Sequence, residues 1–323
     1  MNETSPPLDV RNHFRLATAG LAWHRAEPGF SGAVVWRGDD PSGAPQVALK
    51  GWPPGVTAER VEQVHAWQGQ AALLPFVPRV LPGARRAPAV LADGRVWDAC
   101  SWMPGEPLRA PTEAGVRAAC AAAAQLHRCW PVAERKPCPG VAARLDILTA
   151  YRTRLGAWAR DLAPVAAELD ALLARAARAV ERGADAAVTA LRPWLIRSFP
   201  LRPCLRDLRG DHVLFSSGRL TGVIDYGAMA VDHVAVDLAR LLDDLAAADR
   251  SLFQAGLAAY RDAGGPLDAP DEFVSLLAAT GAMCSALGWL VRVFAHREPV
   301  ARPAAVAERL GKLVARVERI EHF

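Results

Sequence analysis

Residues 204–215 read CLRDLRGDHVLF, and residues 221–227 read TGVIDYG. The β-type runs in these two segments are joined by Ser-Ser-Gly-Arg at 216–219, which predicts a β-hairpin. Asp207 lies in the loop before the hairpin, His212 opens its first strand, and Asp225 ends its second. Residues along a strand are spaced by about 3.3 Å, and paired strands lie about 4.8 Å apart. The hairpin therefore brings His212 and Asp225 to the same end of a small sheet.

An imidazole and a carboxylate that converge in this way suit a divalent cation bound to nucleotide phosphates. The loop carboxylate of Asp207 is then available to orient an attacking hydroxyl. A solvated polar turn between a helix and a hairpin is the competing interpretation, because a single loop Asp or His needs no function. The combination and spacing of these residues favour the catalytic interpretation.

The segment resembles the catalytic loop and metal-binding Asp of the aminoglycoside phosphotransferase and choline kinase family, which has a protein-kinase-like fold. That family usually reads His-Gly-Asp-Leu-His-x-x-Asn-Val-Leu-Phe, followed by Gly-Val-Ile-Asp and an aromatic residue. Asp207 matches the catalytic Asp, and Asp225 matches the metal-binding Asp 18 residues later. The resemblance extends over about residues 20 to 300. It implies an α+β, bilobal fold with a small β-rich N-terminal lobe and a larger helical C-terminal lobe.

The loop departs from the family pattern at several positions. Leu205 and Arg209 stand where the family has its two His residues, and Arg206 stands where it has Gly. His212 occupies the position of the second metal ligand, which is Asn in the family. A cation at Arg209 could steady the transferring phosphoryl group, although a solvated loop arginine is an equally simple explanation.

Lys50 lies in the apolar segment Val-Ala-Leu-Lys of the N-terminal region. Of the 38 basic residues only three are lysines, so a lysine here indicates a need for a compact ammonium group rather than a guanidinium. The resemblance implies that Lys50 holds the α- and β-phosphates of a nucleotide and pairs with a helix glutamate. Glu62 and Glu59 are the candidates, and Glu62 is preferred because it lies deeper in the predicted helix. An exposed lysine at a strand end is the alternative.

Two further segments are candidates for nucleotide binding. Gly29, Ser31 and Gly32 lie in a short loop that resembles the phosphate-covering loop of kinases, although a plain hairpin turn explains it equally well. By the same resemblance, the main chain near Ser101 and Met103 is the hinge that would bond adenine, unless this segment is simply a core strand.

Two residues outside these segments are expected to support the loop. The resemblance has Asp237 bracing the backbone of the catalytic loop, although an Asp at a helix N-terminus is also favoured by the helix dipole. His127, at the end of an Ala-rich helix, is expected to be structural rather than catalytic.

Short strand-like runs before about residue 105 give way to helical patterns after it. This change predicts an N-terminal nucleotide-binding lobe at 1–103 and a helical lobe at 104–323. Strands are expected at 21–25, 33–37, 46–52, 87–92 and 95–103, with one helix at 57–70. The dipeptide Asp-Gly at 93–94 predicts a two-residue hairpin turn. Helices are expected at 112–128, 141–162, 165–182, 237–248, 251–263, 272–295 and 304–320, around the hairpin strands 213–215 and 220–224.

Composition excludes several classes of protein. With 51% hydrophobic residues, 22% charged residues and a net charge of +4, the chain is neither disordered nor a typical nucleic-acid-binding protein. The six cysteines are too far apart for a CxxC motif and are expected to be free thiols. The longest apolar stretch, 276–291, is short for a bilayer span and predicts a buried helix. A cytoplasmic protein with no nucleic-acid or membrane partner is therefore expected.

The sequence predicts an ATP-dependent phosphotransferase that uses Mg²⁺ or Mn²⁺ and acts on a hydroxyl of a small molecule. Asp232, Asp243 and Asp244 could bind a cationic acceptor such as an aminoglycoside or choline, and a sugar or amino-alcohol remains equally open. The altered catalytic loop keeps an alternative, a catalytically impaired pseudokinase that acts as a nucleotide-binding or scaffold module. The choice between ATP and GTP and the oligomeric state are not indicated.

Overall fold

The computed structural model describes residues 4–160, 167–247 and 249–320 of the chain. It divides into two compact units, of which the first contains residues 1–110, 128–130 and 210–229. The second contains residues 111–127, 131–209 and 230–323. The first unit is rich in strands and the second in helices, which confirms the predicted α+β class. The division differs from the expected segments 1–103 and 104–323 because the hairpin after residue 210 belongs to the first unit.

A five-stranded antiparallel sheet forms the first unit, in the order β1-β2-β3-β5-β4. Its strands are β1 (Ala22–Arg25), β2 (Val34–Asp39), β3 (Pro45–Gly51), β4 (Ala89–Ala92) and β5 (Arg95–Ser101). The turn between β4 and β5 has positive φ at both Asp93 (50°) and Gly94 (70°), as the Asp-Gly dipeptide predicts. Helix α1 (Leu8–His13) contributes Val10 to the apolar core beneath the sheet, beside Trp36 and Leu49.

Helix α2 (Ala58–Gln70) begins after Thr57, whose hydroxyl accepts a hydrogen bond from the backbone N–H of Arg60. The helix buries Val61, Val64, His65 and Gln68. These positions are spaced i, i+3, i+4 and i+7, so they form one face of the helix. Glu62 lies off this face and is exposed.

A second sheet of the first unit contains the predicted hairpin. Strand β9 (Val213–Ser216) pairs with β10 (Arg219–Val223) on one side and with β6 (Glu106–Pro107) on the other. The tight turn places Ser217 and Gly218 at positive φ, and the register shifts by one residue between Leu220 and Gly222. His212 lies in a short 3₁₀ turn directly before β9, rather than in the strand itself.

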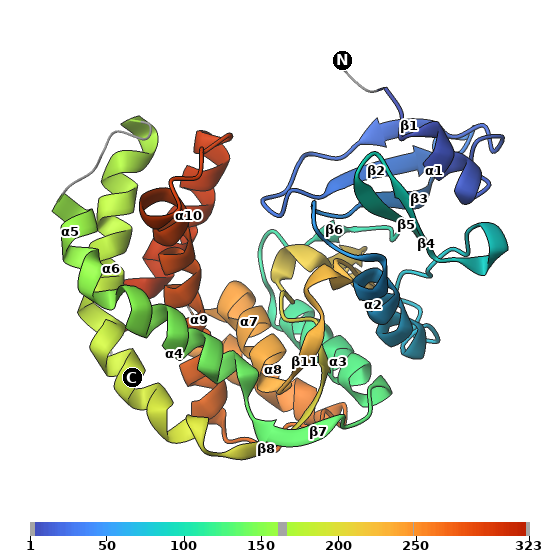
Figure 1. Ribbon diagram of the computed structural model, residues 1–323. Helices are drawn as coiled ribbons and strands as arrows, with labels where there is room; N and C mark the ends of the chain where they lie inside the picture. The colour runs from blue at the N-terminus through green and yellow to red at the C-terminus, as the bar shows by residue number, and fades with distance from the viewer. Residues whose placement is uncertain (1–3, 161–166, 248, 321–323) are drawn as a thin grey trace. The chain divides into compact units, whose positions relative to one another are not determined.

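The second unit is built mainly from eight helices among the described residues (Figure 1). They are α3 (Glu113–Cys129), whose last two residues belong to the first unit, α4 (Pro139–Tyr151), α5 (Leu155–Arg160), α6 (Ala167–Leu191), α7 (Ala235–Ala246), α8 (Arg250–Asp262), α9 (Asp271–Leu290) and α10 (Pro303–Val317). The helix expected at 141–162 is interrupted after Tyr151, and α6 continues well beyond the expected end at 182. The expected boundary between 162 and 165, and residue 248, lie outside the described residues.

A small sheet in the second unit was not predicted. It consists of β7 (Glu134–Pro137), β8 (Ser198–Cys204) and β11 (Ala230–Asp232), in the order β11-β8-β7. Strand β8 contains two prolines, which usually argue against a central strand. Its last residue leads directly into the segment Leu-Arg-Asp at 205–207, so this sheet positions the start of the loop that was predicted to be catalytic.

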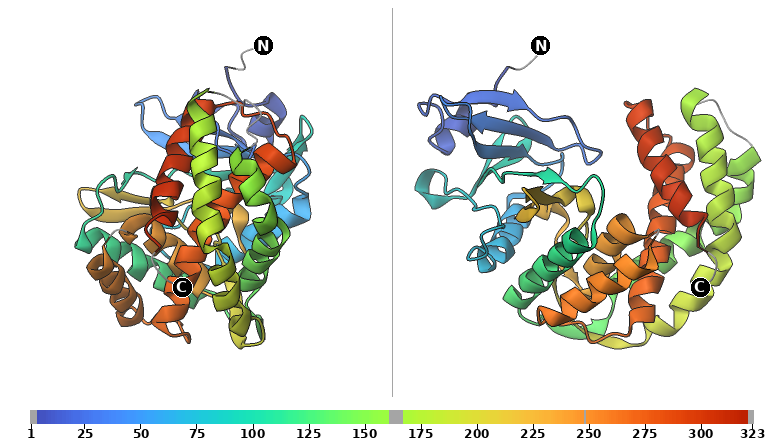
Figure 2. Two further views of the ribbon diagram at one scale, coloured as in Figure 1. Left: turned by 90° about the vertical axis from the view of Figure 1, so that its left-hand side faces the viewer. Right: turned by 180° about the vertical axis from the view of Figure 1, so that it is seen from behind.

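Helix α9 continues through a π turn at Val291–Ala295. Within the described residues, this 25-residue helix is the one that is long and apolar enough to cross a membrane, and 67% of its most apolar window is buried. It contacts α4, α6, α7 and α10, and Figure 2 shows it among these helices. It is therefore a core helix of the second unit, as the apolar stretch predicts.

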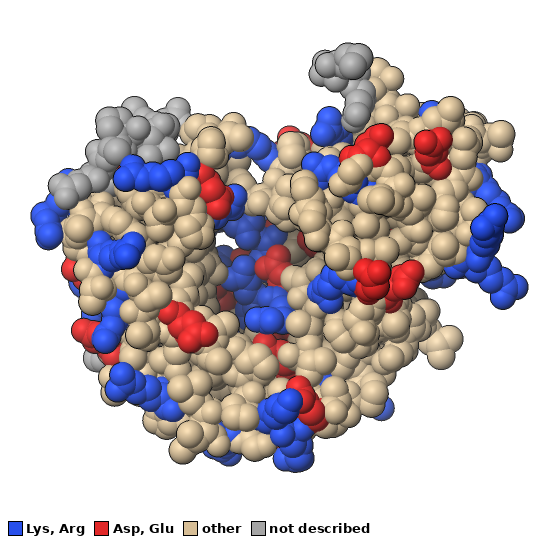
Figure 3. Space-filling model, viewed as in Figure 1, with Lys and Arg blue, Asp and Glu red and all other residues tan. Residues whose placement is uncertain are grey.

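Charged side chains of both signs are interspersed over the face drawn in Figure 3. This distribution agrees with the nearly equal numbers of basic and acidic residues, 38 and 34.

Replacing either of two helical glycines by alanine should change the free energy of unfolding in opposite directions. A Cβ at Gly256 of α8 would lie 2.5 Å from Leu242 and 3.0 Å from Cys120, whereas nothing lies within 4 Å of a Cβ at Gly288 of α9. We expect Gly256→Ala to lower the free energy of unfolding by about 1–3 kcal/mol through overpacking. Gly288→Ala should raise it by about 0.5–1 kcal/mol, because alanine has the higher helix propensity. Urea denaturation of both variants measures the difference, and equal effects would contradict this account of the packing.

Candidate active site

A pocket of about 380 Å³ opens in the first unit. Its walls come from the five-stranded sheet, from α2 and from residues on either side of the β9–β10 hairpin. The predicted site residues that line it are Gly29, Ser31, Lys50, Ser101, Met103, His212 and Asp225. Residues from four separate parts of the sequence thus surround one space that is large enough for a small ligand.

Lys50 projects from β3 and donates a hydrogen bond from Nζ to Asp225 Oδ1 at 2.9 Å. Its ammonium also lies 4.7 Å from the centre of the Trp52 ring. Asp98 of β5 is the cross-strand partner of Lys50, so both side chains lie on the same face of the sheet. Burial alone would lower the pKa of Lys50, but the Asp225 and Asp98 carboxylates outweigh it and raise that pKa.

The expected pairing of Lys50 with a helix glutamate is not found. Glu62 and Glu59 are both exposed on α2, and neither forms an ion pair with Lys50. The face of α2 that is turned to the sheet instead carries His65, whose Nε2 lies 2.8 Å from Asp98 Oδ2. Trp52 donates its indole N–H to the same oxygen at 2.9 Å. A buried Asp98 therefore lies where the prediction placed Glu62.

A second residue of α2 fixes the loop after the hairpin. Arg60 donates from Nη2 to the carbonyl oxygens of Gly227, at 3.2 Å, and of Met229. Asp225, at the start of this loop, has a positive φ of 63° and accepts a weak hydrogen bond from the N–H of Gly227 at 3.4 Å. Helix α2 thus holds the segment that presents Asp225 to the pocket.

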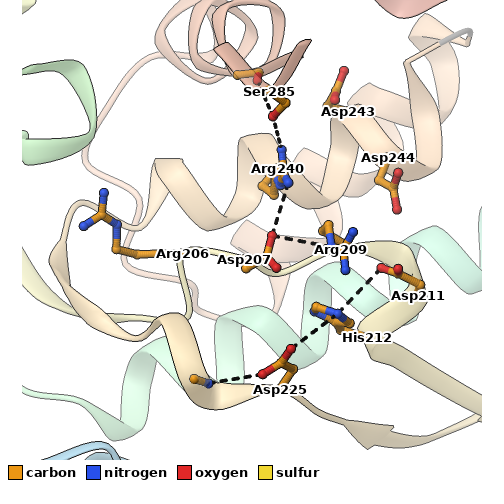
Figure 4. Close-up of polar contacts among 12 residues, drawn as sticks. Arg206, Asp207, Arg209, Asp211, His212, Asp225, Arg240, Asp243, Asp244 and Ser285 are labelled. Atoms are coloured by element: carbon orange, nitrogen blue, oxygen red, sulfur yellow. Dashed lines mark hydrogen bonds and ion pairs between the residues drawn. The ribbon is translucent and has the colours of Figure 1, made fainter. Parts of the chain in front are cut away.

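Asp225 and His212 lie close together, as the hairpin predicts. His212 Nε2 is 3.8 Å from Asp225 Oδ2 and 3.9 Å from Asp211 Oδ1 (Figure 4). Burial would raise the pKa of Asp225, but the charges of Lys50 and His212 hold it below its usual value. A carboxylate oxygen and an imidazole nitrogen at this spacing fit a divalent transition metal such as Mn²⁺, and the carboxylate also suits Mg²⁺.

The second unit contains the predicted site residues Asp207 and Arg209. Asp207 Oδ1 accepts a hydrogen bond from Arg240 Nη2 of α7 at 3.1 Å and lies 3.4 Å from Arg209 Nε. Arg240 also donates from Nη1 to Ser285 Oγ of α9 at 2.7 Å, so its guanidinium bridges α9 and the loop (Figure 4). The Asp207 side chain is one-third exposed and remains accessible.

Asp237 of α7 braces the catalytic loop, as expected. It is fully buried and accepts hydrogen bonds from the backbone N–H groups of Leu205 and Arg206, at 2.6 Å each. His127 lies beneath it, with Nε2 3.1 Å from Asp237 and Nδ1 2.7 Å from the Tyr260 hydroxyl. His127 is fully buried, which agrees with its expected structural role.

Four residues near the predicted positions were missed: Arg60, His65, Asp98 and Arg240. Arg240 follows Asp237 by three residues, a spacing that puts both side chains on one face of a helix, so the sequence contained a usable signal. His65 belongs to the apolar stripe of α2, which also indicates its direction. Asp98 could be paired with Lys50 only once the register of β3 and β5 was known.

Comparisons with known proteins agree with this arrangement. The model of the phosphotransferase enzyme family APH matches residues 22–273. A spectinomycin phosphotransferase solved with ADP and spectinomycin has 10% sequence identity and a TM-score of 0.68, with 94% of each chain covered. An aminoglycoside phosphotransferase from Alicyclobacillus acidocaldarius has 15% identity and a TM-score of 0.62, over 100% of this chain and 98% of that one.

A macrolide 2'-phosphotransferase from Brachybacterium faecium, solved as the apoenzyme, has 18% identity and a TM-score of 0.53, over 98% of this chain and 100% of that one. No curated protein sequence matches the chain. At these identities the solved structures establish the fold, and the family model establishes the relationship. The chain belongs to the phosphotransferase enzyme family and has a protein-kinase-like fold.

Proposed function

We propose that the protein transfers the γ-phosphoryl group of ATP to a hydroxyl group of a small molecule. The observation that carries this proposal is that Lys50, His212 and Asp225 line one and the same pocket. Asp207 precedes His212 by five residues, so whatever the placement of the two units, their Cα atoms are at most about 18 Å apart. The nucleotide site and the proposed base are therefore linked by a short, fixed length of chain.

Lys50 and the loop of Gly29, Ser31 and Gly32 are the proposed phosphate ligands. An ammonium group suits the α- and β-phosphates, and the backbone N–H groups of the loop add hydrogen-bond donors. Adenine is placed at Ser101 and Met103. The N–H of Ser101 already donates to the carbonyl of Arg79 at 2.8 Å, so any contact of Ser101 with adenine uses its carbonyl oxygen.

We assign the divalent metal to Asp225 and His212. When bound, the metal neutralises charge on the nucleotide phosphates. In the structure Asp225 is paired with Lys50, so nucleotide binding exchanges this ion pair for contacts of each partner with the phosphates or the metal. Arg60 keeps the Asp225 loop in place during this exchange through its bonds to Gly227 and Met229.

Asp207 is the proposed base. The acceptor oxygen forms a bond to the γ-phosphorus while the bond from that phosphorus to the β,γ-bridging oxygen breaks, and ADP leaves with the electron pair. The hydroxyl proton passes to Asp207. Arg209 lies close enough to Asp207 to steady charge on the transferring group.

The direct test combines nucleotide binding with transfer. A ligand at about 100 times its dissociation constant stabilises the folded state by about 2.7 kcal/mol, so ATP and GTP with Mg²⁺ or Mn²⁺ are compared by thermal shift. ³¹P NMR with an acceptor panel then detects a new phosphate ester. No stabilisation by any nucleotide would contradict the proposal.

Binding without transfer would instead support the alternative, a nucleotide-binding module without turnover. The observation that favours this alternative is the engagement of Asp207 by two arginines.

Neutralising Asp207 and neutralising Asp225 should have different effects on turnover and on ATP binding. We expect Asp207→Asn to lower turnover by about 10²-fold or more while ATP affinity stays near that of the wild type, because the base does not hold the nucleotide. Asp225→Asn should weaken metal-dependent ATP binding as well as turnover. Turnover and nucleotide affinity are measured separately on both variants. Equal losses of ATP affinity would contradict the assigned roles.

We also infer that Asp98, and not Glu62, orients Lys50 for the phosphates. Asp98→Asn keeps the side-chain shape and should weaken ATP and ADP binding by about tenfold, whereas adenosine binding should not change because adenosine lacks phosphates. Glu62→Gln, an equally conservative change on α2, is the matched control and should have no effect. Isothermal titration with the three ligands distinguishes them. A loss with Glu62→Gln alone would restore the helix glutamate to this role.

The residue at position 212 should set the metal preference. Imidazole nitrogen favours Mn²⁺ over Mg²⁺, whereas a carboxamide oxygen suits Mg²⁺. We therefore expect the wild-type protein to bind ATP more tightly with Mn²⁺, and His212→Asn to shift the preference toward Mg²⁺. Metal titrations of nucleotide binding on both proteins measure this. Identical metal preferences would show that His212 does not contact the metal.

A further inference from the structure

Arginine side chains gather around Asp207 in the second unit. Arg240 lies between Asp207 and Ser285, and Arg209 approaches the same carboxylate oxygen of Asp207 (Figure 4). A third guanidinium, that of Arg144 on α4, lies near Arg240, whose charge contributes to lowering the pKa of Arg144. We call Arg144, Arg209 and Arg240 the arginine cluster. Two of its three cations lie beside the Asp207 carboxylate, and the third, Arg144, interacts with Arg240.

Within the part of the chain that the structure describes, Arg144 has no carboxylate at ion-pair distance, although the charge of Asp232 acts to raise its pKa. Its Nη1 donates to the carbonyl of Gly140 at 2.8 Å and its Nη2 to that of Leu277 at 3.2 Å, while its Nε is buried without a hydrogen bond. Burial is the largest cause that lowers the pKa of this guanidinium. The Asp232 carboxylate offsets only part of this effect. A cation whose guanidinium donates to carbonyl groups alone would be stabilised further by an anion that binds it.

One face of α9 joins Arg144 to Arg240. The carbonyl of Leu277 accepts a hydrogen bond from Arg144, and the hydroxyl of Ser285 accepts one from Arg240. Gly281 is four residues from each of them, so all three lie on one face of the helix. A Cβ at Gly281 would lie 3.3 Å from Arg144 Nη2, so the absence of a side chain there leaves room for the guanidinium. The two cations therefore bind to the same strip of α9, and Arg240 also contacts the proposed base Asp207.

The nearby carboxylates are already bound by the protein's own donors. Arg316 pairs with Asp243 at 3.1 Å and also with Asp244. Asp232 is fully buried, lies 3.4 Å from Arg206 Nε, and accepts hydrogen bonds from backbone N–H groups. These three aspartates are the ones that the sequence offered to a cationic acceptor, and each has an arginine beside it.

We propose that the acceptor carries an anionic group, a carboxylate or a phosphate, near the hydroxyl that is phosphorylated, and that Arg144 and Arg240 bind it. This inference rests on the proposed phosphotransfer. The forked guanidinium matches both kinds of anion in a bidentate geometry. A polycationic acceptor would instead meet like charge. An anion that draws Arg240 away also removes one of the two guanidinium groups beside the Asp207 carboxylate.

Matched probes of one carbon skeleton test the charge preference on the wild-type protein. Glycerate, glycerol 3-phosphate and glycerol carry a carboxylate, a phosphate and no charge, and choline and kanamycin represent cations. With ADP and Mn²⁺ present, we expect at least one of the two anions to bind tenfold or more tightly than glycerol. Comparing glycerate with glycerol 3-phosphate then identifies which anion is preferred. The inference is overturned if neither anion binds better than glycerol, or if choline or kanamycin binds best or is phosphorylated.

A variant then assigns the preference to the cluster. Arg144→Met removes the charge with little change in volume, and we expect it to weaken binding of the preferred anion tenfold or more while ATP affinity is unchanged. Arg178→Met, on the exposed surface of α6, is the matched control and should change neither. Unchanged anion binding in Arg144→Met would contradict the assignment.

The wild-type probe series decides the charge preference even if Arg144→Met fails to fold. Loss of nucleotide binding in the wild type would contradict the proposed function, whereas normal nucleotide binding with the wrong acceptor preference contradicts this inference alone.

Discussion

The buried carboxylate of Asp237 is the interaction on which the catalytic loop depends. Its two oxygens each accept a hydrogen bond from a backbone N–H, of Leu205 and of Arg206, and the side chain is fully buried. A buried charge is stable only when such donors satisfy it, and leaving one unsatisfied costs about 1–3 kcal/mol or more. Arg206 has a positive φ of 62°, which these bonds help to hold. The direction in which the chain leaves β8, and hence the place of Asp207, follows from this constraint.

The chain uses arginine almost exclusively, so the lysine at position 50 is unusual. Lys50 pairs with Asp225 and faces Asp98, and in the proposed function its point charge would exchange Asp225 for phosphate groups. Around Asp207 the cations are guanidinium groups, which have a fixed fork geometry and bridge helices to the loop. In the proposed function, the lysine would therefore serve the nucleotide and the arginines an acceptor of opposite charge.

Most of the architecture could be predicted from local patterns. The Asp-Gly turn, the amphipathic stripe of α2 and the β9–β10 hairpin all depend on nearest neighbours in the sequence, and each is present. Strand β8 was missed because its two prolines argue against a strand, and its pairing with β7 and β11 is a long-range property. The prediction that a helix glutamate pairs with Lys50 was wrong, because the buried face of α2 turns His65, and not Glu62, toward the sheet.

The sequence by itself determined the family, the α+β class and the spacing of Asp207, His212 and Asp225, because these are encoded in one contiguous stretch and its hairpin. Only the tertiary structure decided which groups neutralise one another. Asp98 meets Lys50 through strand register, and Arg240, Arg316 and Arg206 reach their aspartates across helices and loops that are distant in sequence. Charge pairing acts over a few ångströms in space and is independent of separation along the chain, so the electrostatics of the acceptor side emerged only from the folded protein.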